Sequence, residues 1–279
     1  MRGKDPKKAK AGRVVMGVFG DAGHGKTWGA LAWPNTYYFD CEGGASLPHY
    51  TDRLSEVGAL YVGREDGAGN FDVVLEEIDE LARTKHDRKT IVIDSLTKLF
   101  ENEVVIENER LQGLGKSTAY GVDKKPARNK GRRLDRRLEL SDMNAILVCH
   151  SKPIWSKDGE VIGRTFDAWE QLSYELNLIV EVIKRGPERL ARVHKSRYET
   201  FPEGDVLPWT YDAFAERLFR EDIEAEHEAV ALASAEQVAR VEELISDRGV
   251  DDKSVAKVLD AEGVSDFAEM RADRIAECI

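Results

Sequence analysis

Short runs rich in β-branched and aromatic residues alternate with amphipathic stretches along most of the chain. Several of these runs are apolar at nearly every position, as expected of strands that are covered on both faces. The predicted strands are Arg13–Phe19, Thr36–Asp40, Ala59–Val62, Thr90–Asp94, Ala145–His150, Leu176–Ile183 and Leu190–Lys195. The predicted helices between them are Thr27–Ala32, Asn70–Thr84, Leu96–Arg110 and Gly131–Asp142. This alternation predicts an α/β fold with a mainly parallel central sheet.

The last two predicted strands are separated by a segment that contains Gly186-Pro187, which predicts an antiparallel hairpin at the end of the sheet. Beyond Trp209 the pattern is helical, and Gly249 and Gly263 fit the ends of helices. The helices predicted there are Tyr211–Ala229, Ala235–Asp247, Asp252–Ala261 and Ser265–Glu277.

Charge divides the chain in the same region. The whole chain has 41 Lys+Arg and 52 Asp+Glu, a net charge of −11. Residues 221–279 contain 17 acidic and 6 basic residues, which accounts for the whole excess, because residues 1–220 contain 35 of each. We therefore expect four parts: a basic flexible tail at 1–12, a core at 13–221, a linker at 222–234 and a small all-α, acidic three-helix domain at 235–279.

The sequence contains no segment typical of membranes or of secretion. No apolar run approaches the roughly 20 residues that a transmembrane helix needs, and the first residues, MRGKDPKKAK, are basic and polar. Cys41, Cys149 and Cys278 lie far apart, which argues against a disulfide framework or a zinc site. We therefore expect a cytoplasmic protein with no membrane partner.

A phosphate-binding motif follows the first predicted strand. Residues 20–27 read GDAGHGKT and match G-x-x-x-x-G-K-[ST] between a strand and a helix, as the motif requires. Its glycines let backbone N–H groups surround phosphate oxygens, Lys26 supplies a positive charge, and the Thr27 hydroxyl ligates Mg²⁺. The motif therefore predicts binding of ATP with Mg²⁺. The residues predicted to bind the nucleotide are Gly20, Asp21, Ala22, Gly23, His24, Gly25, Lys26, Thr27 and Trp28.

Three polar residues at the ends of predicted strands complete the candidate site, with Lys26 as a further catalytic residue. Asp94 is the predicted second ligand of Mg²⁺, although an aspartate there can also cap the next helix. Glu42 is the predicted catalytic residue that orients or deprotonates the attacking water, and the alternative is an ordinary acidic loop residue. His150 is either a catalytic sensor of the γ-phosphate or a buried structural histidine.

These elements, in this order, resemble the RecA-like recombinase ATPase core over roughly residues 13–200. YYFDCEGG around Glu42 resembles the strand that ends in the catalytic glutamate, and IVIDSLTKL around Asp94 resembles the Walker B strand. VCHSK resembles the sensor strand, with His150 where bacterial RecA has glutamine. Only about a dozen residues precede the first predicted strand. In this respect the core resembles the short RecA-like phage proteins of recombination and single-strand annealing.

The resemblance implies an ATP site between subunits. The strand LARVHKSR is similar to the family's basic strand, whose side chains reach the ATP of the adjacent subunit. Lys195 and Arg197 are therefore expected to bind the nucleotide of a neighbour in a homo-oligomer, either a ring or a filament. The alternative is that both are ordinary solvated residues.

Basic residues gather between Arg110 and Arg137, where 10 are basic and 2 are acidic. In the RecA-like family this segment and the later loop, here Ser151–Gln171, face DNA. Cations that neutralise phosphates and rings that stack on bases suit a single strand, although a charge run also fits a solvated helix face. The predicted DNA-binding residues are Lys116, Lys124, Lys125, Arg128, Lys130, Arg132, Arg133, Lys152, Trp155, Lys157 and Arg164, and Phe166 and Trp169 add aromatic rings to the later loop.

Taken together, these patterns predict an ATPase that binds single-stranded DNA and anneals or pairs strands in recombination. Three alternatives are a DNA motor such as a helicase or packaging ATPase, an ATP-switched binding module with little turnover, and a small-molecule kinase, against which the basic loops argue. The acidic C-terminal helices are expected to avoid DNA. They are a candidate site for a single-strand-binding protein or another replication protein, or a competitor of DNA for the basic loops.

Overall fold

The computed structural model describes residues 13–117, 121–122, 124–262 and 264–279. The predicted basic tail at 1–12 and the helix end predicted at Gly263 lie outside the described residues. No helix in the described part of the chain is long and apolar enough to cross a membrane.

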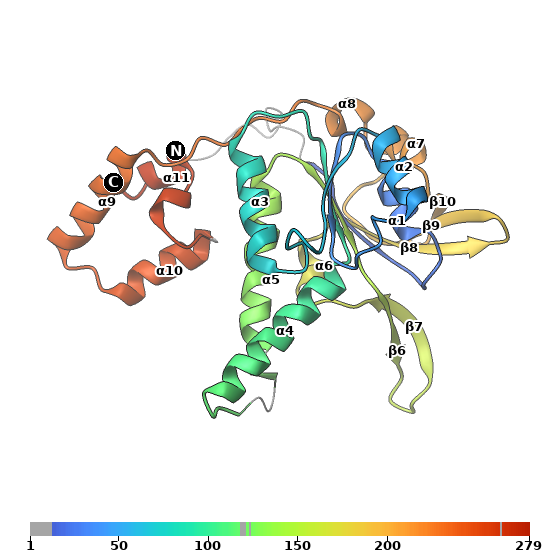
Figure 1. Ribbon diagram of the computed structural model, residues 1–279, viewed down its shortest axis with the longest axis horizontal. Helices are drawn as coiled ribbons and strands as arrows, with labels where there is room; N and C mark the ends of the chain where they lie inside the picture. Colours follow the sequence, from blue (N-terminus) through green and yellow to red (C-terminus); the bar gives the residue numbers. More distant parts are fainter. Residues whose placement is uncertain (1–12, 118–120, 123, 263) are drawn as a thin grey trace.

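An eight-stranded sheet with the order β10-β9-β8-β1-β5-β4-β2-β3 forms the centre of the molecule (Figure 1). The pairs from β8 through β1, β5, β4 and β2 to β3 are all parallel, and β8, β9 and β10 pair antiparallel. Both the mainly parallel sheet and the terminal hairpin are thus confirmed. The strands are β1 (Val15–Phe19), β2 (Thr36–Asp40), β3 (Leu60–Val62), β4 (Thr90–Asp94), β5 (Asn144–Val148), β8 (Leu178–Arg185), β9 (Glu188–Ser196) and β10 (Val206–Pro208).

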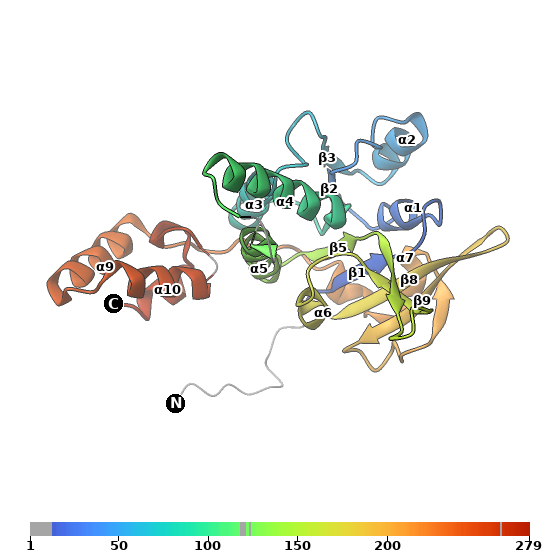
Figure 2. The same ribbon diagram turned by 90° about the horizontal axis from the view of Figure 1, so that it is seen from below.

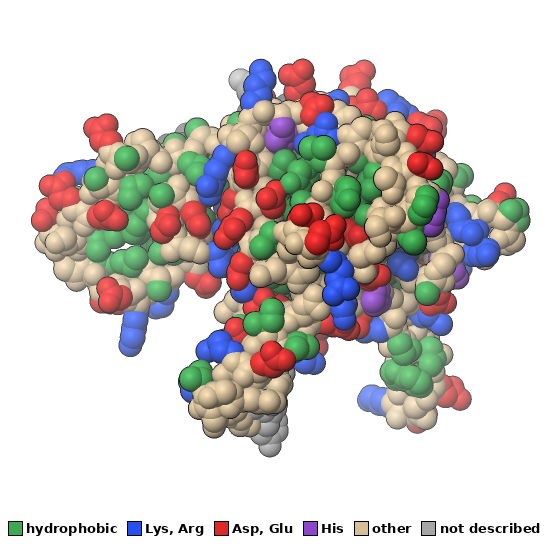
Figure 3. Space-filling view, viewed as in Figure 1, with side chains coloured by type: hydrophobic (Ala, Val, Ile, Leu, Met, Phe, Trp, Pro, Cys, Tyr) green, Lys and Arg blue, Asp and Glu red, His purple; other side chains and the backbone are tan. Residues whose placement is uncertain are grey.

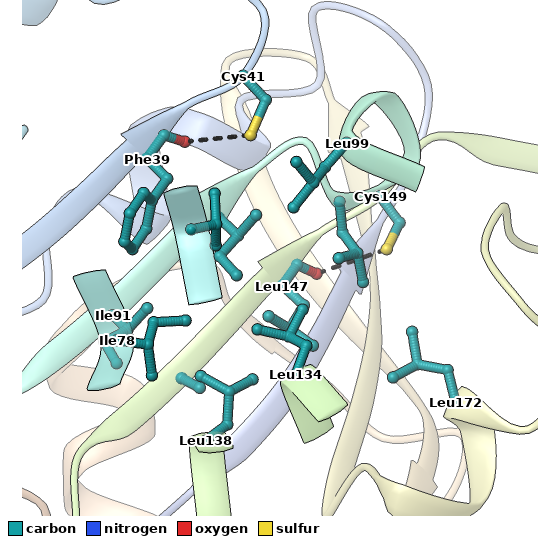
Figure 4. Packing of buried hydrophobic residues seen from close by; sticks show 14 of the residues in the cluster. Phe39, Cys41, Ile78, Ile91, Leu99, Leu134, Leu138, Leu147, Cys149 and Leu172 are labelled. Atoms are coloured by element: carbon teal, nitrogen blue, oxygen red, sulfur yellow. Dashed lines mark hydrogen bonds between the residues drawn. The ribbon is translucent and has the colours of Figure 1, made fainter. Parts of the chain in front are cut away.

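Helices cover both faces of the sheet, which is why its central strands are apolar throughout. One face packs against α3 (Phe71–Arg83), α4 (Leu96–Gly113), α5 (Lys124–Leu140) and α6 (Leu172–Glu175). The other packs against α1 (Lys26–Ala30), α2 (Pro48–Glu56), α7 (Tyr211–Arg217) and α8 (Arg220–Ile223). Figure 4 shows the first of these cores, where Ile78, Leu99 and Leu134 from three helices meet Ile91 and Leu147 from the strands.

The predicted loop Ser151–Gln171 contains a second, two-stranded sheet. β6 (Ser151–Trp155) pairs antiparallel with β7 (Val161–Phe166), and the hairpin projects away from the main sheet (Figure 1). Phe166 and Trp169 are buried in the core, so the prediction that they face DNA is wrong. Gly131 of α5 permits this burial, because a Cβ atom there would lie 2.9 Å from the indole ring of Trp169.

The C-terminal helices differ in part from those predicted. Tyr211–Ala229 is not one helix, because Phe219 adopts a left-handed conformation (φ 59°) between α7 and α8 and the chain from α8 to Ala229 is not helical. Ser265–Glu277 is also divided, since Asp266 caps a short 3-10 turn, Phe267–Glu269, before α11 (Ala272–Ala276). As predicted, Gly249 ends α9 (Ala235–Arg248) in the left-handed region. Together with α10 (Asp252–Glu262), these helices surround a separate hydrophobic cluster (Figure 2).

Candidate nucleotide-binding site

The phosphate-binding loop connects β1 to α1 and is shaped by its glycines. Gly20 has a φ of 148°, and a Cβ atom there would lie 2.5 Å from the carbonyl oxygen of Val182. Gly25 is the left-handed N-cap of α1, with a φ of 85°. Lys26 Nζ donates to the carbonyl oxygens of Gly20 at 2.9 Å and Asp21 at 3.1 Å. The lysine therefore lies across its own loop, where it can exchange these carbonyls for phosphate oxygens.

Trp209, which follows β10, supports the loop from behind. Its indole N–H donates to the carbonyl oxygen of Gly25 at 3.1 Å, and the ring packs directly against Gly29 of α1. Only a residue without a side chain fits there, because a Cβ atom at Gly29 would lie 2.0 Å from Trp209 Nε1.

Thr27 and Asp94 form the candidate magnesium site. The Thr27 hydroxyl donates to Asp94 Oδ2 at 2.5 Å, so the two predicted ligands are already adjacent. Burial, with a contribution from the nearby Glu42 charge, raises the pKa of Asp94 to about 6, although the Thr27 hydrogen bond lowers it. The Lys26 charge also lowers the pKa of Asp94, but it does not offset the burial. A buried carboxylate of this kind is a group that a bound cation stabilises. The helix-cap alternative fails, because the N-cap of α4 is Ser95, whose hydroxyl accepts from Lys98 N–H.

Glu42 lies in the loop after β2, and Asp40 shapes that loop. The buried Asp40 carboxylate accepts hydrogen bonds from the backbone N–H groups of Gly43, Gly44 and Ala45, which makes Asp40 a structural residue. Glu42 Oε1 lies 2.5 Å from Ser95 Oγ and 2.6 Å from His150 Nε2. Partial burial raises the pKa of Glu42, but hydrogen bonds from Ser95 and His150 outweigh it and leave the pKa below its usual range. Glu42 is therefore charged near neutral pH.

The predicted residues that follow four adjacent strands meet around a cavity of about 380 Å³. The strands are β1, β5, β4 and β2, whose carboxyl ends lie side by side in a parallel sheet. The lining residues are Gly20, Asp21, Ala22, Gly23, Lys26, Thr27, Glu42, Asp94, His150 and Ser151. His150 is nearly half exposed at this cavity, which argues against the buried structural alternative.

Other predicted nucleotide-binding residues lie outside this cavity. His24 turns toward β8, with Nδ1 3.0 Å from the Val182 carbonyl oxygen. Trp28 is 46 % exposed, and the Arg53 guanidinium lies 5.2 Å from its ring centroid. Lys195 and Arg197 lie near the start of β8, at the opposite end of the parallel strands from the cavity. There, Lys195 Nζ donates to the carbonyl of Leu176 at 2.8 Å, and Arg197 donates to that of Tyr174. Within one chain these two basic residues do not reach the phosphate-binding loop, so a role in a neighbour's site stays a prediction.

The predicted DNA-binding residues fall into two groups. Lys116, Lys125 and Lys157 are exposed near the ends of the α4–α5 pair and of the β6–β7 hairpin, and Lys124, Arg128 and Arg132 lie on α5. The others are engaged by the protein. Lys130 pairs with Glu103 at 2.9 Å and Asp72 at 2.8 Å, Arg133 donates to Ser265, and Lys152 pairs with Asp167 at 3.1 Å.

Arg164 provides a contact that the sequence analysis missed. It extends from β7 to the Asp21 carboxylate of the phosphate-binding loop. At the base of the same hairpin, Thr97 Oγ1 accepts from His150 N–H at 2.9 Å and donates to the Asp167 carbonyl at 2.5 Å. The hairpin is thus attached to the cavity at two points. Ser95 and Trp209 were also missed, since each acts through a neighbour that is distant in sequence.

Magnesium binding should depend on pH through Asp94. The metal requires the carboxylate, so below about pH 6 protons compete with Mg²⁺, and the Mg²⁺ concentration for half-maximal ATPase activity should rise steeply, by up to about tenfold per pH unit. Titrations with Mg²⁺ between pH 5 and pH 8 measure this. The same titrations with Asp94→Asn measure the part of the pH dependence that comes from protonation of ATP itself. An identical Mg²⁺ requirement for the native protein at pH 5 and pH 7.5 would contradict the assignment.

The chain was compared with known protein families, with curated proteins and with solved structures. A protein-family model described as an AAA domain matches residues 13–189. The structure is similar to a RadB recombinase (18 % identity, TM-score 0.43, covering 71 % of this chain and 87 % of that one). It is also similar to a KaiC-like protein from Pyrococcus horikoshii OT3 (14 % identity, TM-score 0.44, covering 72 % of this chain and 93 % of that one). A third similar structure is the flagellar accessory protein FlaH from Methanocaldococcus jannaschii (12 % identity, TM-score 0.37, covering 72 % of this chain and 91 % of that one). No curated protein matches the chain in sequence.

Proposed function

Because the chain belongs to the AAA-domain family of nucleotide-binding ATPases, matched over residues 13–189, we propose that it couples ATP hydrolysis to the binding of single-stranded DNA in recombination. In this proposal the protein anneals or pairs DNA strands and acts as a homo-oligomer. ATP binding orders the DNA-binding elements, and hydrolysis releases the strand.

The observation that carries the proposal is the attachment of the β6–β7 hairpin to the nucleotide cavity. The hairpin begins one residue after His150, and its Arg164 pairs with Asp21 of the phosphate-binding loop. A phosphate that draws Lys26 away from the Asp21 carbonyl, or that competes with the Asp21 carboxylate for Arg164, would therefore also move the hairpin. This connection gives a physical route by which nucleotide and DNA affect each other's binding.

The hairpin and the α4–α5 pair suit a single strand. Both project on the same side of the molecule in Figure 1, and their exposed lysines include Lys116, Lys125 and Lys157. Figure 3 shows hydrophobic side chains gathered on the hairpin. Trp155 and Ile162 of the hairpin strands are 61 % and 66 % exposed. An exposed ring beside a lysine can stack on a base while the cation neutralises a phosphate.

At the ATP site, the chain's own residues divide the chemistry. Thr27 and Asp94 would hold Mg²⁺, which neutralises the phosphate oxygens when it is bound. Lys26 contributes a second positive charge to the phosphates. Glu42, charged at neutral pH, accepts the proton of the attacking water, and His150 detects the state of the γ-phosphate.

A neighbouring subunit would complete the site with Lys195 and Arg197. Their present partners are backbone carbonyls near α6, away from this chain's own cavity, so in this proposal they reach only the ATP of a neighbour. The acidic C-terminal helices would leave DNA to the two projecting elements. In this proposal they bind a single-strand-binding protein or another replication protein, or compete with DNA for α5.

The proposal is tested by ATPase rates with and without single-stranded DNA, read beside oligomer size. We expect DNA to stimulate the native protein, and Trp155→Ala to weaken DNA binding by about 5- to 100-fold, the equivalent of one lost stacking contact. Phe219→Ala removes another exposed aromatic ring, far from the hairpin, and serves as the matched control. ATPase activity that is indifferent to DNA would reject the recombination function, and directional unwinding would favour a DNA motor.

A further inference from the structure

Ser95 connects two functional side chains without reaching the cavity itself. Its hydroxyl oxygen lies 2.5 Å from Glu42 Oε1 and 3.3 Å from His150 Nε2. Ser95 is 1 % exposed, whereas Glu42 and His150 both line the cavity. Because a carboxylate oxygen can only accept, the single hydroxyl proton of Ser95 is donated to Glu42.

The backbone of Ser95 is fixed more firmly than that of Glu42. Ser95 follows β4 directly and is the N-cap of α4, where its oxygen accepts from Lys98 N–H at 3.2 Å. Glu42 lies in a loop, and its side chain is 45 % exposed. A hydrogen bond from a rigid element to a loop carboxylate limits the positions that the carboxylate can take.

We infer that Ser95 is the positioning residue for Glu42: its hydroxyl orients the carboxylate toward the water that attacks ATP. Ser95 and His150 both bind Oε1. The second oxygen of Glu42 then accepts the proton of that water. This inference rests on the proposed role of Glu42 and adds a residue that was not among the predicted site residues.

The test compares variants at Ser95 in the full-length protein. Ser95→Gly removes the hydroxyl but retains most N-cap stability, because glycine is among the residues that an N-cap tolerates well. We expect kcat for ATP hydrolysis to fall about 10- to 100-fold, the loss that matches one hydrogen bond to a charged group, while KM for ATP changes by less than about twofold. Ser95→Thr retains the hydroxyl and should recover most of kcat.

Two controls separate this role from a structural one. Asn70→Ala removes the matched N-cap of α3, which has no contact with the cavity, and should leave kcat unchanged. Glu42→Gln tests the proposed base directly. If Glu42→Gln abolishes hydrolysis while Ser95→Gly retains native kcat, the inference about Ser95 is wrong and the role of Glu42 stands. If Glu42→Gln remains active, the proposed role of Glu42 fails and the inference fails with it. A rise in KM for ATP with unchanged kcat in Ser95→Gly would also overturn the inference about Ser95.

Discussion

Lys26→Ala is expected to reduce ATP hydrolysis at least about a hundredfold, the effect of removing one preorganised charge from a phosphoryl-transfer site. Lys26 lines the cavity, and its ammonium group lies over the loop that would surround the phosphates. The lost hydrogen bonds go to backbone carbonyls that face solvent in part, so the variant should remain folded. Initial rates at saturating Mg²⁺ and ATP measure the effect.

Lys157→Ala is the matched control for this measurement. Lys157 is exposed in the β6–β7 turn, away from the phosphate-binding loop. Its replacement should leave the DNA-independent ATPase rate within about twofold, because a distant exposed charge is screened by salt. A Lys26→Ala protein that retains a tenth of native activity would contradict the assignment of the site.

Gly29→Ala should destabilise the protein by about 3 kcal/mol, a large effect for one methyl group. The new Cβ atom would lie 2.0 Å from Trp209 Nε1 and 2.4 Å from Trp209 Cε2, and neither atom can move without breaking the hydrogen bond to Gly25. Weaker ATP binding should follow, since that hydrogen bond supports the phosphate-binding loop. Chemical denaturation and the KM for ATP measure the two effects.

The clash predicts that the effect of Gly29→Ala on the free energy of unfolding changes sign when Trp209 is also replaced. When Trp209→Ala has removed the ring, Gly29→Ala should be neutral or stabilising by up to about 1 kcal/mol, because alanine favours a helix over glycine. Gly113→Ala, at a helical glycine with open space around it, is the control and should not destabilise. Equal destabilisation by Gly29→Ala in both backgrounds would show that Trp209 is not the cause.

The sequence predicted the parts of the site that depend on local order. Lys26 and Thr27 follow a strand in a recognised motif, and Glu42, Asp94 and His150 each lie at or near the end of an apolar strand. Parallel strands bring their carboxyl ends to one edge, so four separate segments meet there. Long-range contacts were not predictable in this way. The proximity of Ser95 to Glu42 depends on β4 lying beside β2.

Other errors have equally specific causes. The β6–β7 hairpin lies off the main sheet, and its hydrophobic residues Trp155, Val161 and Ile162 are exposed, so no buried face imposes an alternating pattern on it. The predicted helix Tyr211–Ala229 fails at Phe219, which adopts positive φ without the glycine or asparagine that would signal it. The roles of Lys195 and Arg197 depend on a second chain, so one sequence cannot test them.

If the proposed binding of single-stranded DNA holds, the ion pairs of α5 and of the β6–β7 hairpin limit how strongly salt affects it. Each free cation that binds a phosphate of single-stranded DNA releases a counterion. Each such contact makes the binding constant fall with about the 0.7 power of the salt concentration. Lys130, Lys152 and Arg164 already neutralise carboxylates of the protein. Exchanging such a partner for a phosphate leaves a carboxylate that must recruit a cation from solution. The affinity should therefore vary with ionic strength less steeply than the number of basic residues suggests, which would let the protein exchange between strands at physiological salt.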